Sequence, residues 1–588
     1  MATHTVLGVT VDERGAHFGV WAPFADTLGV TGDFTNWSKE GVPLERNKDG
    51  TWSGYIAGVE VGQEYKYVIR HGKKLLERND PRALQLTAAQ DATVIVSPEF
   101  DWQNDTFELP PPSEQVIYEL HIGTFNRSDP ATPGTFASAL EKLDYLRDLG
   151  INVIEVMPVS GTNMERWWGY EPTYLYSVEA AYGGRQAFKE FVRGAHQRGI
   201  GVVVDVVYNH LTPQPGFDLW RFDGWSEPGK GGIYFYSDAR IETPWGPRPD
   251  YGRPEVQAYI IDNARMWIED CHADGLRLDA IFAIRNTNGW NDDPEHDLPE
   301  GWKLLQDINK AVHTANPHAI TIAEDVACNE HVTRPTAHGG AGFDAQWETT
   351  FPNILRHTID PVHDADRSLA PIEAELRKYY NGQAFQRVVY SESHDADANG
   401  QARLNAEISP SDPDDIFARR RSMLAASVAF TAPGIPMLFQ GQEFMEPGWF
   451  THWNQLDWSR ADTFQGTVQF YRDLCTLRRN LRGQTAGLKG QGYETLQCDE
   501  EGKVLAYHRW DKGGPQDDTV VILNFSNTTH ENYELKFPAA GTWKVRLNSD
   551  WQGYSPDFTN VHTDDVAVEA NTGHITIAPY SVIILSQD

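Results

Sequence analysis

Short apolar segments alternate with amphipathic segments from about residue 115 to about residue 485. The strand-like segments are, in order, VIYELHIG, NVIEVMPV, GVVVDVVYNH, GLRLDA, AITIAED, AGFDAQW, RVVYSESHD and GIPMLFQGQEF. Stretches with the apolar period of a helix, such as GRQAFKEFVRGAHQRG, lie between most of them. Eight strand–helix units in strict alternation build a parallel sheet that closes into a barrel. We therefore predict an α/β chain with a (β/α)₈ TIM barrel over residues 109–486, interrupted by an aromatic and glycine-rich insertion at about 211–253.

The two flanks of the barrel have a different pattern. Segments of residues 1–108, such as GAHFGVWAP and TWSGYIAGV, alternate with period two between turn residues. The same alternation returns after about residue 487, in KVLAYHRW and TVVILNF. A chain of 588 residues is too long for a single core. We predict an N-terminal antiparallel β-sandwich over residues 1–108 and a C-terminal one over residues 487–588.

Polar side chains follow or end four of the predicted barrel strands. They are Asp205, Asn209 and His210 on the third, Arg277 and Asp279 on the fourth, Glu324 and Asp325 on the fifth, and His394 and Asp395 on the seventh. One acid at a strand end is usually a helix cap or part of a structural ion pair. Several such clusters at the same end of one barrel repel one another, and an arrangement that costs stability is usually kept for function. The carboxyl ends of barrel strands are also where active sites lie.

These carboxylates suit either a metal site or chemistry on a glycosidic bond. A metal site would favour Mg²⁺ or Mn²⁺, but Arg277 already supplies positive charge beside Asp279. Glycoside hydrolysis or transfer needs one carboxylate as nucleophile and one protonated carboxyl as acid, and no metal. We therefore expect neither a metal nor a cofactor. Aromatic side chains after the second strand are candidates to stack on sugar rings: Trp167, Trp168, Tyr170 and Tyr174.

Composition excludes several classes of partner and compartment. The formal net charge of −33 argues against binding nucleic acid or anionic membranes, both of which require basic surfaces. The sequence shows neither a secretory signal nor a membrane-length apolar run, and its four cysteines form no CxxC pair. We expect a cytoplasmic protein with reduced thiols. The oligomeric state is not predictable from these features.

Four motifs, DVVYNH, GLRLDA, IAEDV and SESHD, resemble in this order the signature regions of the α-amylase superfamily of glycoside hydrolases. The resemblance covers the whole chain, because VWAPFADTLGVTGDFTNW is similar to the family's N-terminal starch-binding-type module and a C-terminal β domain is usual in it. It implies a retaining enzyme that acts on α-1,4-glucans through a covalent glycosyl–enzyme intermediate.

The resemblance also implies roles for individual residues. Asp279 matches the nucleophile, Glu324 the general acid/base, and Asp395 the acid that grips the distorted sugar. The substrate-binding positions are Arg277, which would hold the nucleophile, His210 and His394, which would bind sugar hydroxyls, Asp205, which would support the site, and Tyr170 and Trp168, which would supply aromatic surface.

The motifs indicate less clearly which group accepts the sugar from the intermediate. IYELHIGTF and WGYEPTYLYSVEAAYGG resemble both glycogen branching enzymes and maltooligosyltrehalose trehalohydrolases. YSESHD and LFQGQEFMEPGWFTHWNQLDW are closer to branching enzymes, whereas LRLDAIFAI is closer to trehalohydrolases. Branching by transfer to a glucan 6-hydroxyl is the favoured hypothesis, and hydrolysis of an α-glucan or of maltooligosyltrehalose is the alternative. Hypotheses of other classes are a non-catalytic glucan-binding protein and a metal-dependent hydrolase.

Overall fold

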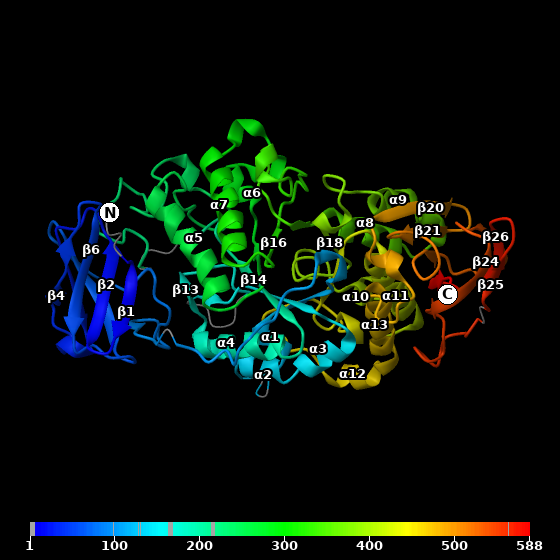
Figure 1. The fold of residues 1–588 in the computed structure, drawn as a ribbon, viewed down its shortest axis with the longest axis horizontal. Coiled ribbons are helices and arrows are strands. Elements are labelled where there is room, and N and C mark those ends of the chain that lie inside the picture. The colour runs from blue at the N-terminus through cyan, green and yellow to red at the C-terminus, as the bar shows by residue number, and fades with distance from the viewer. Residues whose placement is uncertain are drawn as a thin grey trace.

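The computed structural model describes residues 6–588 except 98, 128, 130, 163–167, 213–217, 562 and 563. In this part of the chain, eight parallel strands close into a barrel at the centre of an elongated molecule. A β-rich domain lies at each end, the N-terminal one in blue and the C-terminal one in red (Figure 1). The predicted TIM barrel between two β domains is confirmed.

Each predicted barrel segment contains one strand of the barrel, and the strands follow chain order around it. They are β10 (Ile117–Leu120), β11 (Val153–Val156), β14 (Gly201–Val206), β15 (Gly275–Leu278), β16 (Ile320–Ala323), β17 (Ala345–Trp347), β18 (Arg387–Tyr390) and β19 (Ile435–Phe439). β19 pairs in parallel with β10 and closes the sheet. A hairpin of β12 (Ser160–Gly161) and β13 (Tyr174–Val178) follows β11 and was not predicted.

Helices surround the barrel and bury one apolar face against it. In α4 (Gly184–His196), for example, Phe188, Phe191 and Val192 are buried. The other long helices are α5 (Pro254–Glu269), α7 (Pro299–Ala315), α8 (Thr350–Ile359), α11 (Ile416–Thr431) and α13 (Gln465–Arg478). Shorter ones are α1 (Ile122–Phe125), α2 (Phe136–Leu140), α3 (Leu143–Leu149), α6 (Phe282–Arg285), α9 (Ala370–Leu376), α10 (Leu404–Ile408) and α12 (Ser459–Thr463). Within the described ranges, no helix has both the length and the apolar character that crossing a membrane requires.

The interior of the barrel changes from apolar to charged along the strands. On β10, β11 and β14 the inward residues are first Ile117, Val153 and Val203, which belong to one apolar cluster. Two residues further on, where side chains return to the same face, the inward residues are Glu119, Glu155 and Asp205. The parallel register places Asp205 beside Arg277 on β15. The charged layer therefore lies at the carboxyl end of the barrel, where the predicted site residues also lie.

The N-terminal domain consists of two packed sheets, with strand orders β1-β2-β6-β5 and β4-β3-β7-β8, and β9 pairs with β7. The strands are β1 (Gly8–Asp12), β2 (Gly15–Trp21), β3 (Thr27–Gly32), β4 (Val42–Pro43), β5 (Glu45–Arg46), β6 (Thr51–Ala57), β7 (Glu64–His71), β8 (Lys74–Arg78) and β9 (Thr93–Val94). The domain contacts the barrel insertion, where the Phe24 ring stacks on Trp225 with 4.4 Å between centroids.

The C-terminal domain is also built of antiparallel strands. One sheet has the order β20-β21-β22-β27-β24-β25, and β23 pairs with β26. The strands are β20 (Gly492–Asp499), β21 (Val504–Trp510), β22 (Thr519–Asn524), β23 (His530–Lys536), β24 (Gly541–Asn548), β25 (Val566–Val568), β26 (Thr572–Ile577) and β27 (Ser581–Ser586).

Candidate active site

A cavity of about 790 Å³ opens at the carboxyl ends of the barrel strands. Among its lining residues are Trp168, Tyr170, His210, Asp279, Glu324, His394 and Asp395. The remaining two predicted site residues, Asp205 and Arg277, are buried directly beneath it. The structure thus brings together residues that lie up to 227 positions apart, from Trp168 to Asp395.

Arg277 is the centre of the charged layer. Its Nη1 lies 2.7 Å from Asp205 Oδ2 and 3.2 Å from Asp279 Oδ1, and its Nη2 lies 2.9 Å from Glu324 Oε2. The guanidinium also packs over the ring of Trp347, with its carbon 4.4 Å from the ring centroid. Burial works against the charged form, but the carboxylates outweigh it and raise the pKa of Arg277 well above its usual range. One permanently charged side chain therefore contacts three carboxyl groups.

Asp279 follows the last residue of β15 and is held on both sides of its carboxylate. Asn209 donates to Oδ2 at 2.7 Å, while Arg277 contacts Oδ1. The Asn209 amide also donates to the Asp279 carbonyl at 2.9 Å. These contacts fix the direction of the carboxylate, as a nucleophile requires.

The surroundings of Glu324 favour the protonated form of its carboxyl group. Burial raises the pKa of Glu324 to about 8, the Arg277 guanidinium opposes this rise, and the charges of Asp279 and Asp395 add to it. The backbone N–H of Ala280 donates to Oε2 at 2.9 Å. Glu324 is therefore protonated at neutral pH and can donate a proton, which is the state that a general acid needs.

Asp205 and Tyr170 support the floor of the site. The Tyr170 hydroxyl donates to Asp205 Oδ2 at 2.6 Å, and the Tyr170 ring stacks on His394 with 5.1 Å between centroids. Burial raises the pKa of Asp205 to about 7, although Arg277 acts to lower it. Tyr170 thus contacts both Asp205 in the charged layer and His394 in the cavity lining.

The two histidines of the site hold different charge states. Burial lowers the pKa of His210 to about 4, and its Nδ1 donates to Asn209, so its neutral Nε2 is an acceptor. This Nε2 is buried and has no hydrogen-bond partner among the described residues. Burial also disfavours charge on His394, but Asp395 and Glu119 outweigh it and raise the pKa of His394 to about 9. The site therefore offers one imidazole as acceptor and one as donor.

Asp395 and Trp168 both lie against His394. The Asp395 side chain is 42% exposed, accepts from the Asn399 amide at 2.9 Å, and has Oδ1 3.4 Å from His394 Nε2. Trp168 stacks on Phe450 with 5.5 Å between centroids and meets His394 edge-on. Asp395 is thus an exposed carboxylate beside a charged imidazole.

The other two aromatic candidates, Tyr174 and Trp167, are not among the described residues that line the cavity. Tyr174 lies elsewhere, since its hydroxyl donates to Asp218 at 2.7 Å and accepts from Asn79 of the N-terminal domain. Trp167 lies outside the described residues.

Comparison with known proteins identifies the family. The family profile described as "Alpha amylase, catalytic domain" matches residues 120–217 and 234–474, which is more than half of the chain. The chain belongs to the α-amylase family. Residues 6–83 of this α-amylase family member match carbohydrate-binding module 48 (isoamylase N-terminal domain), and residues 496–588 match the α-amylase C-terminal all-beta domain.

Among relatives of this family member are proteins named 1,4-alpha-glucan branching enzyme GlgB. The protein of Salinibacter ruber is 30% identical, and the match spans 98% of this chain and 96% of that protein. The protein of Corynebacterium jeikeium is 31% identical, and the match spans 95% of this chain and 80% of that protein. Solved structures of similar fold include the Paenibacillus barengoltzii pullulanase in complex with maltohexaose and alpha-cyclodextrin, and the Bacillus subtilis type I pullulanase in complex with maltose. Both superpose with a TM-score of 0.78 and cover 100% of this chain. The first is 21% identical and is covered over 95% of its own chain, and the second is 20% identical and is covered over 86%.

Sequence reasoning missed Glu119 in this family member. Glu119 receives the His394 backbone N–H on Oε2 at 3.1 Å and the His394 Nδ1–H on Oε1. A charged residue within the apolar segment VIYELHIG was the signal that could have revealed it.

A second missed group is an aromatic wall formed by Trp245, Phe282 and Trp290. Their centroids lie 5.0 to 6.0 Å apart, and all three line the cavity. Trp245 comes from the insertion after β14 and Trp290 from the loop after α6, so no periodic pattern connected them.

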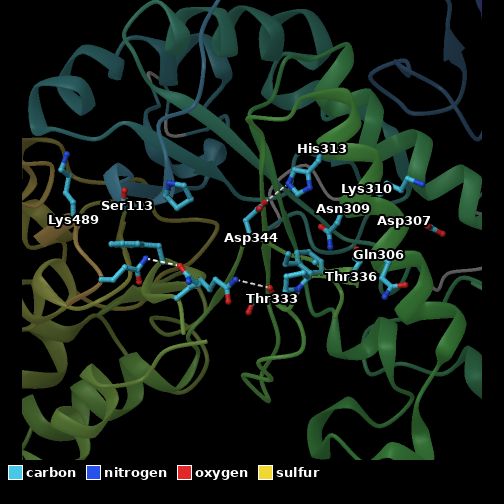
Figure 2. A pocket seen from close by; sticks show the side chains of 18 of the residues that line it. Ser113, Gln306, Asp307, Asn309, Lys310, His313, Thr333, Thr336, Asp344 and Lys489 are labelled. Atoms are coloured by element: carbon cyan, nitrogen blue, oxygen red, sulfur yellow. Dashed lines mark hydrogen bonds and ion pairs between the residues drawn. The ribbon is translucent and has the colours of Figure 1, made fainter. Parts of the chain in front are cut away.

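A larger cavity, of about 930 Å³, lies between α7 and the start of the C-terminal domain. Figure 2 shows its lining, in which His313 and Asp344 form an ion pair of 2.9 Å. Phe343, Asp344, Gln383 and Phe385, which precede β17 and β18, place it at the amino-terminal end of those strands. None of the predicted site residues lines it. The smaller cavity therefore remains the candidate active site of this α-amylase family member.

Proposed function

We propose that this protein is a 1,4-α-glucan branching enzyme that works by double displacement, with Asp279 as nucleophile and Glu324 as general acid/base. The observation that carries the chemistry is the shared cation: Arg277 contacts both carboxyl groups, and burial raises the pKa of Glu324 to about 8. A carboxyl that donates a proton beside a carboxylate that attacks the anomeric carbon is what double displacement at a glycosidic bond requires. The match of residues 6–83 to a carbohydrate-binding module supports an α-glucan as substrate.

In the first step, protonated Glu324 donates its proton to the glycosidic oxygen of an α-1,4 bond. Asp279 attacks the anomeric carbon, the bond from that carbon to oxygen breaks, and the leaving chain departs with a free 4-hydroxyl. His210 Nε2 would accept from one sugar hydroxyl and charged His394 would donate to another. The exposed Asp395 carboxylate would accept further hydroxyl hydrogen bonds as the ring flattens toward the oxocarbenium-like transition state.

In the second step, a glucan 6-hydroxyl attacks the same carbon. Its proton passes to Glu324, which is now ionised, and the bond from the anomeric carbon to Asp279 breaks. The number of glycosidic bonds is unchanged, because one α-1,4 bond is replaced by one α-1,6 bond. Relatives named 1,4-alpha-glucan branching enzyme support this choice of acceptor.

Incubation with amylose tests the proposal. We expect iodine staining to shift toward shorter wavelengths with little increase in reducing ends, and a debranching enzyme to release short linear chains from the product. Asp279→Asn should remove both the iodine shift and the release of short chains. Abundant reducing sugar without α-1,6 linkages would contradict branching and favour a hydrolase, and trehalose released from maltooligosyltrehalose would favour a trehalohydrolase.

A further inference from the structure

The aromatic wall presents two exposed ring faces to the cavity. The exposed fractions of Trp245 and Trp290 are 37% and 56%, and both line the space that holds Asp279 and Glu324. Because large exposed apolar surfaces usually mark binding sites, a ligand is expected to cover them. We propose that Trp245 and Trp290 form the acceptor subsite, in which they stack on the glucan whose hydroxyl attacks the intermediate. This inference rests on the proposed transfer function.

The base of the wall adjoins the acid/base. Phe282 packs in one apolar cluster with Ala280 and Val326. Ala280 provides the N–H that holds Glu324, and Val326 lies two residues after Glu324. The acid/base must reach the oxygen that leaves in the first step and the hydroxyl that attacks in the second. The surface beside Glu324 is therefore where leaving and incoming glucans lie, whereas Tyr170 and His394 stack on each other in another part of the lining.

The loop that carries Trp290 is held firmly next to Glu324. Arg285 donates through Nε to Asp325, the residue after Glu324, at 2.8 Å, and it also pairs with Asp292. A Cβ on Gly289 would lie 2.5 Å from the Phe282 carbonyl oxygen, so this position requires glycine for the close approach. Trp290 consequently reaches Phe282 with 5.0 Å between ring centroids.

The loop that carries Trp245 packs against His210, which is proposed to bind a sugar hydroxyl. The Gly246 N–H donates to the Thr243 hydroxyl at 3.0 Å, and a Cβ on Gly246 would lie 3.1 Å from the His210 ring. The Trp245 centroid lies 5.9 Å from that of His210. The wall therefore runs without interruption from the proposed site of the bound glucose to Trp290.

Such a surface discriminates between a sugar and water. A pyranose buries its C–H face on an indole ring and gains hydrophobic and dispersion energy, whereas water gains neither there. Acceptor binding at the wall would thus raise the local concentration of hydroxyl groups next to the intermediate. The acceptor oxygen bonds to the anomeric carbon, its proton goes to Glu324, and the bond to Asp279 breaks.

The role of the aromatic wall can be tested by measuring how a glycosyl fluoride donor divides between transfer to an acceptor and hydrolysis. With α-maltotriosyl fluoride as donor and maltohexaose as acceptor, fluoride release measures total turnover, and chromatography separates transfer products from free maltotriose. The first step here breaks only the carbon–fluorine bond, so no glucan has to leave along the wall. We expect Trp290→Ala to lower the transfer-to-hydrolysis ratio about tenfold, and the double variant with Trp245→Ala to lower it further. Trp290→Phe should retain most of the ratio.

Trp551, 51% exposed in the C-terminal domain, provides the matched control, and Trp551→Ala should leave the ratio unchanged. If Trp290→Ala releases no fluoride, Trp290→Leu, which keeps apolar volume without a ring, is measured instead. If the single and double variants have the same transfer-to-hydrolysis ratio as the parent, the inference about the wall is overturned, while the proposed function still stands. A parent enzyme that releases fluoride but forms no transfer product would overturn the proposed function and the inference with it.

Discussion

Arg277 Nη2 lies 2.9 Å from Glu324 Oε2, although Glu324 is the carboxyl that retains its proton at neutral pH. The same guanidinium holds Asp205 and Asp279 through Nη1. A single positive charge cannot neutralise three carboxylates, and burial raises the pKa of Glu324 to about 8 and that of Asp205 to about 7 despite their contacts with Arg277. Contact with Arg277 alone therefore does not ionise Glu324, because burial acts more strongly on this carboxyl.

Replacement of Arg277 by methionine should damage both activity and stability. Three carboxyl groups lose their buried counter-charge, so we expect the free energy of unfolding to fall by about 3–5 kcal/mol. Hydrolytic and transfer activity should fall at least about a thousandfold, because Asp279 loses the contact that directs its carboxylate. Urea unfolding and fluoride release measure the two effects. Arg147→Met, at an exposed ion pair with Asp144, should leave stability nearly unchanged, and an equal loss in both variants would contradict the prediction.

The pH dependence of glucan cleavage should report Glu324. Since its pKa is raised to about 8, kcat/KM with amylose should fall as the pH rises through about 8, where the acid loses its proton. Glycosylation by a glycosyl fluoride needs no acid, so this alkaline decline should be absent from its first step, measured as the burst of fluoride. Glu324→Gln should lose amylose activity yet still show that burst. An alkaline decline of the same midpoint with both donors would assign it to another group.

Glu119→Gln should lower the pKa of His394, because one of the two carboxylates that raise it is neutralised. The folded-state pKa of about 9 lies above the ordinary value, so this ion pair stabilises the fold fully below about pH 6.5 and loses its contribution as the pH rises through about 9. The variant should therefore lose about 1–3 kcal/mol at pH 6 and much less at pH 10. NMR titration of His394 and unfolding at both pH values measure this. Asp344→Asn, at the partly exposed pair with His313, should cost less at pH 6, and a pH-independent loss in Glu119→Gln would refute the prediction.

Two substitutions at Tyr170 separate its hydroxyl from its ring. Tyr170→Phe removes the hydrogen bond to Asp205 and the longer 3.5 Å contact from Arg277 Nη1, and kcat/KM should fall about tenfold. Tyr170→Ala also removes the ring that stacks on His394, and the loss should reach at least about a hundredfold. Initial rates on maltooligosaccharides measure both. Equal losses in the two variants would assign the whole effect to the hydroxyl.

Much of the fold follows from periodicity. Alternation of strand and helix patterns indicates the barrel, and two-residue spacing places Arg277 and Asp279 on one face, as found in their 3.2 Å contact. The motifs also located Glu324 and Asp395 at the same cavity. These are strand-end positions, where local pattern and three-dimensional position are directly related.

Other features could not be read from the sequence. Glu119 becomes meaningful only when the barrel closes and β10 approaches the end of β18, 275 residues away along the chain. Trp245 and Trp290 lie on loops, whose paths depend on contacts such as those of Gly246 and Gly289 rather than on a repeating pattern. Charge states also depend on burial, so the difference between His210 and His394 appears only in the folded protein.

The origin of the aromatic wall in two loops separates it from the carboxyl groups, which are fixed to strand ends. Asp279 and Glu324 adjoin β15 and β16, and any change there disturbs the barrel itself. Trp245 and Trp290 occupy connecting segments that can lengthen, shorten or exchange residues without altering the sheet. Bond cleavage and product identity can therefore diverge independently during evolution. One inherited set of reactive groups can serve descendants with different products, each distinguished by the loops around its rim.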